Sequence, residues 1–321
     1  MKSRRLGSVG RRVSEVGFGG WAIGGDKFET AYGPVDDRES MAAIHRALEL
    51  GVTFFDTSDL YGHGHSEALI GRVLSEWPDR DSVTVATKGG VNFYRPGEEP
   101  EGDFTPYGIA HAVELSRARL RKDSIDLYML MNPPIGVLLE NDRVLETLSA
   151  LRRAGKITAY GISVTDAEEG VALLKAGILL DAIEVTYNMF FQSAAVELLP
   201  LAKKQRVAVI AREPLANGFL AMPKSTYDFA STDHRSAVSP EYLDLFGSMF
   251  DQLDFLKNEK RTVAQAALRF VLDQPEVTTV IPGTRFASHV EENCLASELP
   301  PLTQDELNKI HAVFFPEDEN S

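Results

Sequence analysis

Residues 41–88 read MAAIHRALELGVTFFDTSDLYGHGHSEALIGRVLSEWPDRDSVTVATK and contain the same structural pattern twice. The segment begins with apolar residues at the spacing of one helix face, which are Met41, Ile44 and Leu48. An apolar run at 52–56 follows, as is typical of a buried strand. A second helical stretch ends near Trp77 and leads into the apolar run 83–88. Short connections between alternating helices and strands favour parallel pairing through right-handed crossovers.

The rest of the chain continues this alternation. Further amphipathic stretches run over 109–120 and 144–151, and strand-like runs occur at 126–131, 159–163, 182–187, 207–212 and 278–281. About eight strand–helix units result, the number that closes a barrel. A chain of 321 residues would ordinarily suggest two domains, but α/β barrels run as one domain of about 250 residues or more. No linker divides the sequence, so it predicts an α/β fold, a (β/α)8 TIM barrel, as a single domain over residues 1–321.

Two local features complete this interpretation. Three segments match the capping box of a helix start, and they are Thr165–Glu168, Thr262–Gln265 and Thr303–Glu306. Two connections, Asn92–Phe104 and Pro223–Pro240, are long and polar. Because loops of that length in compact domains are often functional, we expect them to act as lids, with flexible insertions as the alternative.

Composition excludes several classes of protein. With 33 basic and 47 acidic residues the net charge is −14, which argues against nucleic acid or an anionic membrane as the main partner. One cysteine, Cys294, cannot form an intramolecular disulfide or a multi-cysteine metal site. The basic N-terminus lacks a following apolar region, and no apolar run reaches about 18 residues. We therefore expect a soluble cytoplasmic protein with a small-molecule partner. The sequence does not indicate its oligomeric state.

A doubly wound nucleotide-binding fold would carry a glycine-rich signature that this sequence lacks. The glycine-rich segment is Gly17-Phe-Gly-Gly-Trp-Ala-Ile-Gly24, and a G-x-G-x-x-G match from Gly17 would require glycine where Ala22 stands. No GxxxxGK[ST] phosphate loop is present either. This fold is therefore not supported.

Three chemically reactive side chains follow successive predicted strands. Asp56 ends one strand, Tyr61 lies in the loop after it, and Lys88 ends the next strand. Catalytic residues of barrels lie at such strand ends. A tyrosine ordinarily has a pKa of about 10, and a neighbouring ammonium lowers the pKa by favouring the phenolate. Although each residue alone could be structural, together they predict a proton-transfer site.

Six ordered motifs carry a resemblance to a known family. They are Phe55-Asp-Thr-Ser-Asp-Leu-Tyr-Gly62, Thr87-Lys88, Asp126-Leu-Tyr128, Gly161-Ile-Ser163, Pro214-Leu215 followed by Gly218, and Ile281-Pro-Gly-Thr-Arg285 with Glu292-Asn293. On these motifs the sequence resembles the aldo-keto reductases over nearly its whole length. The resemblance implies a barrel that binds NADPH in an extended form and interconverts carbonyls and alcohols. Tyr61 would be the general acid, tuned by Lys88 and Asp56.

The same resemblance assigns residues to NADP(H). Ser163 matches the serine at the nicotinamide carboxamide, and Arg212 stands where many bacterial relatives place an arginine beside the cofactor. The implied pyrophosphate loop contains Pro214, Leu215, Asn217 and Gly218. Phosphate would also meet the helix start at Gly283, Thr284 and Arg285, where Arg285 could bind the adenosine 2′-phosphate and favour NADPH over NADH. The remaining implied contacts are His289, which could donate to phosphate, and Glu292 and Asn293 at the adenine.

Three positions depart from the family pattern. Met131 stands where a histidine is usual, Val164 replaces an asparagine, and Glu184 replaces a glutamine that normally holds the carboxamide. A thioether cannot donate a hydrogen bond to a carbonyl oxygen, and loss of such a donor can cost about a hundredfold or more in rate. Trp21 could wall the substrate pocket beside Met131 and Asn132, although it could equally be a structural aromatic.

These departures leave several hypotheses open. The substrate could bring its own polar groups, as a sugar does, with Asn132, His63 or His65 replacing the lost donor. The protein could instead run a redox-neutral reaction on bound NADP, or bind NADPH as a regulatory subunit with little turnover. Glu184 could be protonated beside the carboxamide or make a different cofactor contact. A metal site at His63 and His65 lacks an evident third ligand, so none is expected.

Overall fold

The computed structural model describes residues 1–27, 31–93 and 101–315. Its centre is a parallel sheet in the order β12-β11-β10-β9-β8-β5-β4-β3. The strands are β3 (Phe18–Gly19), β4 (Phe54–Asp56), β5 (Thr84–Gly89), β8 (Ile125–Met131), β9 (Ile157–Ser163), β10 (Ala182–Thr186), β11 (Ala208–Arg212) and β12 (Val277–Val280). The predicted strands therefore agree with the structure to within about two residues at their ends.

The first and last strands of the sheet meet and close the barrel. The backbone N–H of Gly17 donates to Val280 O at 2.7 Å, and that of Gly19 donates to Pro282 O at 3.1 Å. A Cβ atom on Gly19 would lie 2.6 Å from Ile281 O, so only glycine permits this approach. The structure therefore confirms the predicted (β/α)8 barrel.

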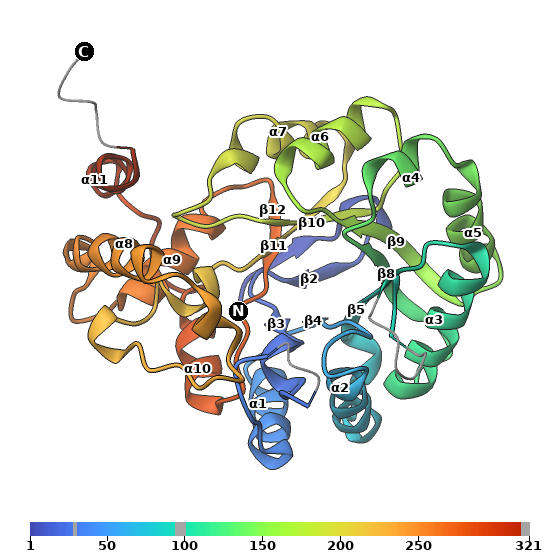
Figure 1. The fold of residues 1–321 in the computed structure, drawn as a ribbon, viewed down its shortest axis with the longest axis horizontal. Coiled ribbons are helices and arrows are strands. Elements are labelled where there is room, and N and C mark those ends of the chain that lie inside the picture. The colour runs from blue at the N-terminus through green and yellow to red at the C-terminus, as the bar shows by residue number, and fades with distance from the viewer. Residues whose placement is uncertain (28–30, 94–100, 316–321) are drawn as a thin grey trace.

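Helices surround the strands, as Figure 1 shows. They are α1 (Asp37–Glu49), α2 (His65–Glu76), α3 (Pro106–Leu120), α4 (Ile135–Leu139), α5 (Asp142–Arg153), α6 (Ala167–Lys175), α7 (Leu198–Gln205), α8 (Pro240–Asp251), α9 (Val263–Leu272), α10 (Ala287–Leu295) and α11 (Gln304–Phe314). The capping boxes at Thr262 and Thr303 are present. The one predicted at Thr165 is wrong by a residue, because the Asp166 side chain caps α6 by accepting from the Glu169 N–H.

Two layers of apolar side chains stabilise the barrel. The larger one lies between the sheet and the helices. The smaller one fills the barrel interior, where the antiparallel hairpin of β1 (Ser3–Arg5) and β2 (Arg12–Ser14) adds Leu6 and Val13 to the inward-facing residues of the strands. The apolar interior excludes water from one end of the barrel and leaves the carboxyl ends of the strands for polar side chains.

The two long connections have different structures. In Asn92–Phe104 the short strands β6 (Val91–Asn92) and β7 (Glu101–Gly102) pair antiparallel, and 94–100 lie outside the described residues. Pro223–Pro240 folds back toward the first barrel strand, where Asp233 forms isolated bridges with Ala31 and Tyr32.

None of the helices in the described residues combines the length and the hydropathy that a membrane span requires.

Candidate functional site

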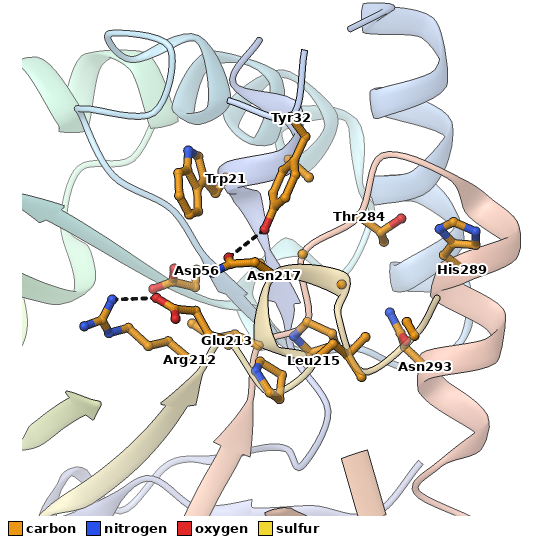
Figure 2. A pocket seen from close by; sticks show the side chains of 18 of the residues that line it. Trp21, Tyr32, Asp56, Arg212, Glu213, Leu215, Asn217, Thr284, His289 and Asn293 are labelled. Carbon is orange, nitrogen blue, oxygen red and sulfur yellow. Dashed lines mark hydrogen bonds and ion pairs between the residues drawn. The ribbon is translucent and has the colours of Figure 1, made fainter. Parts of the chain in front are cut away.

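A cavity of about 600 Å³ opens at the carboxyl ends of the barrel strands. Figure 2 shows its walls, with Trp21 and Tyr32 on one side and the Leu215–Asn217 loop facing Thr284 and Asn293. Most of the predicted site residues line it: Trp21, Asp56, Tyr61, Met131, Asn132, Glu184, Arg212, Pro214, Leu215, Asn217, Gly218, Gly283, Thr284, Arg285, His289, Glu292 and Asn293. The fold therefore brings together side chains from almost the whole length of the chain.

Lys88 and Ser163 lie behind this lining and contact it through hydrogen bonds. The Lys88 ammonium donates to both carboxylate oxygens of Asp56 at 2.6 Å and to Glu184 Oε2 at 3.1 Å. Ser163 Oγ donates to Glu184 Oε1 at 3.1 Å. Asp56, Lys88 and Glu184 are each only 1% exposed. Four strands, β4, β5, β9 and β10, thus contribute to one buried polar cluster, in which Glu184 contacts both the lysine and the serine.

Burial and mutual charge set the protonation of this cluster. Burial raises the pKa of Asp56 well above its ordinary value, and the neighbouring Glu184 raises it further, against the opposing effect of Lys88. For Lys88, burial lowers the pKa, but Asp56 and Glu184 outweigh it, so the net pKa is raised. Lys88 is therefore a fixed ammonium at neutral pH.

Tyr61 lies above the ammonium on the cavity wall. The Lys88 Nζ atom is 5.3 Å from the centre of the Tyr61 ring, and the Trp21 ring stacks on Tyr61 with centroids 6.2 Å apart. Burial raises the pKa of Tyr61 above its ordinary value, while Lys88 lowers it by a smaller amount. The predicted net lowering is thus wrong for this structure, because burial outweighs the ammonium. At neutral pH the phenol keeps its proton and can donate it.

Arg212 ends β11 and lines the cavity. Its guanidinium donates to Glu213 Oε1 at 2.9 Å and to the Val164 carbonyl at 3.1 Å. The Arg212 Nε–H is buried and has no hydrogen-bond partner in the structure. A buried, unsatisfied donor on a cavity wall can bind an acceptor group of a ligand.

The segment that follows β11 has an unusual backbone. Glu213, Ala216, Asn217 and Gly218 have φ angles of 53°, 47°, 56° and 93°. Left-handed conformations at residues other than glycine cost free energy and persist where the surroundings impose them. Such alternation of conformations turns backbone N–H groups inward and forms concavities that suit anions. In this loop the N–H groups of Ala216 and Gly218 donate to Glu213 O and Leu215 O at 2.8 and 2.9 Å, which fixes its left-handed backbone beside the cavity.

The cavity wall opposite this loop is formed by α10 and by the residues just before it. Arg285 donates from its guanidinium to the carbonyls of Tyr32 at 3.4 Å and Pro34 at 2.8 Å, and Thr284 Oγ1 accepts from the Phe286 N–H at 3.1 Å. Glu292 accepts from Thr262 Oγ1 at 2.7 Å. Arg285 lies on the cavity wall with donors left for an anion.

The sequence motifs did not point to two lining residues, Tyr32 and Arg235, or to His234 next to them. Arg235 lines the cavity, pairs with Asp233 at 2.7 Å and lies 4.8 Å over the Tyr32 ring. The Tyr32 hydroxyl donates to Asn217 Oδ1 at 2.9 Å, drawn as a dashed line in Figure 2. The His234 ring stacks on Trp21. No sequence motif marks these residues, because their roles arise from contacts between three distant segments.

Some predicted roles do not match the structure. Neither His63 nor His65 lines the cavity, since His63 stacks on Phe93 and the His65 Nε2 atom pairs with Asp37 Oδ1 at 2.7 Å. In this structure they therefore do not stand in for the donor that Met131 lacks. Val164 packs in the layer between sheet and helices. Among the described residues, no group of three His, Cys, Asp or Glu side chains could hold a metal ion.

Comparison with known proteins gives one consistent result. The model of the Aldo/keto reductase family matches residues 15–314. The chain is 30% identical to the aldo-keto reductase YhdN of Bacillus subtilis, covering 91% of this chain and 87% of the relative, and 29% identical to L-galactose dehydrogenase of Arabidopsis thaliana, covering 98% and 94%. Among solved structures, the holo form of aldo-keto reductase AKR11C1 from Bacillus halodurans is 28% identical, with a TM-score of 0.79 and coverage of 98% and 96%. The glycerol dehydrogenase AKR11B4 from Gluconobacter oxydans is 29% identical, with a TM-score of 0.81 and coverage of 98% and 97%.

Proposed function

Because this chain belongs to the aldo/keto reductase family of oxidoreductases, we propose that its cavity binds NADP(H) and interconverts a small carbonyl compound and its alcohol. The observation that carries this proposal is the placement of Tyr61 on the cavity wall, 5.3 Å by its ring centre from an ammonium held by two buried carboxylates.

The cavity suits an extended dinucleotide. Its two ends carry different chemistry, with the Asp56–Lys88–Glu184 cluster at one and Arg285, His289 and Asn293 at the other. Between them lies the left-handed loop of Ala216 to Gly218, which suits the pyrophosphate. We assign Ser163, Glu184 and Arg212 to the nicotinamide end, and Glu292 and Asn293 to the adenine. Arg285 and Thr284 would hold the 2′-phosphate, which favours NADPH over NADH.

The proposed chemistry divides between cofactor and protein. When bound, NADP(H) supplies the hydride for reduction and accepts it in oxidation. Tyr61 donates its proton to the carbonyl oxygen of the substrate as that oxygen gains negative charge. The Lys88 ammonium stabilises the phenolate left behind, and Asp56 holds Lys88 in place through both carboxylate oxygens at 2.6 Å. Trp21, stacked on Tyr61, excludes water from this wall.

The substrate end lacks a usual donor. Met131 lines the cavity beside the exposed Asn132, and its thioether cannot polarise a carbonyl. We infer that the substrate is a polyol or sugar, whose own hydroxyl groups hydrogen-bond within the site and whose C–H face packs on Trp21. Two similar proteins are named for such substrates, L-galactose and glycerol. The net charge of −14 supports a small-molecule substrate over nucleic acid or a membrane, and we propose a cytoplasmic location.

A direct assay tests the proposal. Purified protein is mixed with NADPH, or with NADP⁺, and a panel of aldehydes, ketones, polyols and sugars, and nicotinamide absorbance is followed. We expect turnover with at least one polyol or sugar, and its loss in Tyr61→Phe. Tight NADPH binding with no turnover across the panel would contradict the enzyme and favour a regulatory NADPH-binding protein.

A further inference from the structure

Asp56 and Glu184 contact the same ammonium from two different strands of the barrel. Asp56 ends β4 and Glu184 lies in the middle of β10, yet Lys88 Nζ is 2.6 Å from the first carboxylate and 3.1 Å from the second. Both carboxylates are 1% exposed, so water contributes little to their solvation. The two acids and one ammonium therefore form a single buried unit that also borders the cavity.

The charges around this unit do not balance. Among the described residues, Lys88 from β5 contacts both carboxylates, Tyr61 from the loop after β4 has its ring centre 5.3 Å from Lys88 Nζ, and Arg212 from β11 acts electrostatically on Tyr61. Arg212 is already paired with Glu213 at 2.9 Å, and Tyr61 is neutral when protonated. One ammonium thus serves two carboxylates. If both were ionised, one buried negative charge would remain without a partner, which is costly in a low-dielectric interior.

Binding one proton removes this excess charge. Two carboxyl groups held this close share a proton more readily than either would bind one alone, as a result of their mutual repulsion. The raised pKa of Asp56, caused by burial first and by Glu184 next, agrees with this arrangement. Both oxygens of Asp56 accept from Lys88 at 2.6 Å and Ser163 Oγ donates to Glu184 Oε1 at 3.1 Å, so these donors stabilise the ionised pair and the proton belongs to the pair as a whole.

We propose that Asp56 and Glu184 form a carboxyl pair that binds one proton, and that this proton is linked to the oxidation state of the bound nicotinamide. The inference rests on the proposed function, which puts the nicotinamide end against Glu184. A cationic, oxidised ring favours the doubly ionised pair, and the proton passes to solvent. A neutral, reduced ring leaves the proton on the pair. Glu184 thus acts on the bound cofactor through its charge.

This linkage makes the preference for oxidised cofactor depend on pH. Since NADP⁺ binding expels a proton and NADPH binding does not, raising the pH tightens NADP⁺ relative to NADPH. The ratio of the two dissociation constants should change by up to about tenfold per pH unit while the pair titrates. With glutamine in place of Glu184, Asp56 faces Lys88 alone and stays ionised, so the ratio loses this dependence.

Isothermal titration calorimetry measures the proton directly. NADP⁺ and NADPH are titrated separately into the full chain in two buffers of different ionisation enthalpy, between about pH 6 and about pH 9. We expect the wild type to release up to one proton with NADP⁺ and much less with NADPH. Glu184→Gln should release none with either. Glu168→Gln removes an exposed carboxylate in the first turn of α6 and should behave like the wild type.

Ser163→Ala gives an independent test that does not depend on how Glu184→Gln folds. Because it removes the donor to Glu184, it should move the midpoint of proton release to higher pH. The proposal is overturned if the wild type binds both forms without proton release, if Glu184→Gln releases as much as the wild type, or if Ser163→Ala leaves the midpoint unchanged. Each of these three results is measured while the cofactor binds, so the proposed function would still stand. If neither form of the cofactor binds, both proposals fail.

Discussion

The indole of Trp21 stacks on the imidazole of His234, with ring centroids 4.7 Å apart and planes inclined by 27°. The two residues are 213 positions apart in the chain, and their contact joins the wall above Tyr61 to the Pro223–Pro240 connection. Next to it, Arg235 pairs with Asp233 and donates to the Asn217 carbonyl at 3.3 Å. These contacts hold the connection against the cavity wall, which Arg235 lines, and its role as a lid stays a prediction.

His234→Ala should speed cofactor release. A stacked aromatic pair contributes about 0.5–1.5 kcal/mol, so loss of the stack on Trp21 should raise the dissociation rate of NADPH by about twofold to about thirteenfold. Stopped-flow displacement of bound NADPH gives this rate. His111→Ala, on α3 and outside the cavity lining, is the matched control. An unchanged rate would mean that the connection does not gate release.

Tyr61→Phe should abolish most turnover while leaving cofactor binding intact. A positioned general acid contributes about 10²–10⁴-fold, and the phenyl ring preserves the stack on Trp21. The measurements are kcat for NADPH oxidation and the NADPH dissociation constant. The control is Tyr107→Phe, at a residue that is 78% exposed. If kcat survives in Tyr61→Phe, another group protonates the substrate.

Met131→His should raise the activity on simple aldehydes. The imidazole would supply the missing hydrogen bond to the carbonyl oxygen, and such a donor can contribute about a hundredfold. For a polyol or sugar substrate we expect a smaller gain, because its hydroxyl groups already occupy the site. The kcat/KM values for both substrate classes are compared in the variant and the wild type. Equal activities in both proteins would rule out the missing donor as the limiting feature.

Arg285→Ala should weaken NADPH binding far more than NADH binding. A charge-assisted hydrogen bond to phosphate contributes about 1.5–3 kcal/mol, which corresponds to about tenfold or more in affinity. NADH has no 2′-phosphate and should change by less than about threefold, through lost contacts of Arg285 with Tyr32 and Pro34. Dissociation constants for both cofactors give the comparison. If the variant lost the same fraction of its affinity for NADPH and for NADH, Arg285 would not be the residue that selects the 2′-phosphate.

Asp56 should make the protein less stable as the pH rises above about 4. Its native pKa is raised from the ordinary value of 3.8, so the native state binds more protons than the unfolded chain in the window above that value. The free energy of unfolding therefore falls through this window, by at most about 1.4 kcal/mol per pH unit, until the native carboxyl ionises. Glu184→Gln removes one cause of the raised pKa and should flatten the fall.

Urea unfolding over a pH series measures this effect. The difference between Glu184→Gln and the wild type isolates the carboxyl pair, because other titrating groups contribute equally to both proteins. Glu168→Gln again serves as the charge-matched control. A difference that does not vary with pH would contradict the raised native pKa of Asp56.

Strand positions were predictable because their signal is local. The runs at 52–56 and 83–88 are apolar and bounded by helical patterns, and the structure has β4 and β5 there. The reactive residues were predictable for the same reason. Asp56 and Lys88 lie at the carboxyl ends of these strands, and parallel strands end at the same rim of the barrel. The single domain over residues 1–321 and the roles of the site residues stay predictions.

Other features depended on contacts that no local pattern contains. The period of the apolar residues was enough to indicate the barrel and the reactive side chains at its strand ends. Three features came from folding alone: Glu184 reaches the ammonium of Lys88, Tyr32 and Arg235 pack together on the cavity wall, and burial keeps the proton on Tyr61. The physical reason is that desolvation and charge pairing depend on the three-dimensional surroundings of a group, which segments distant in the chain create together.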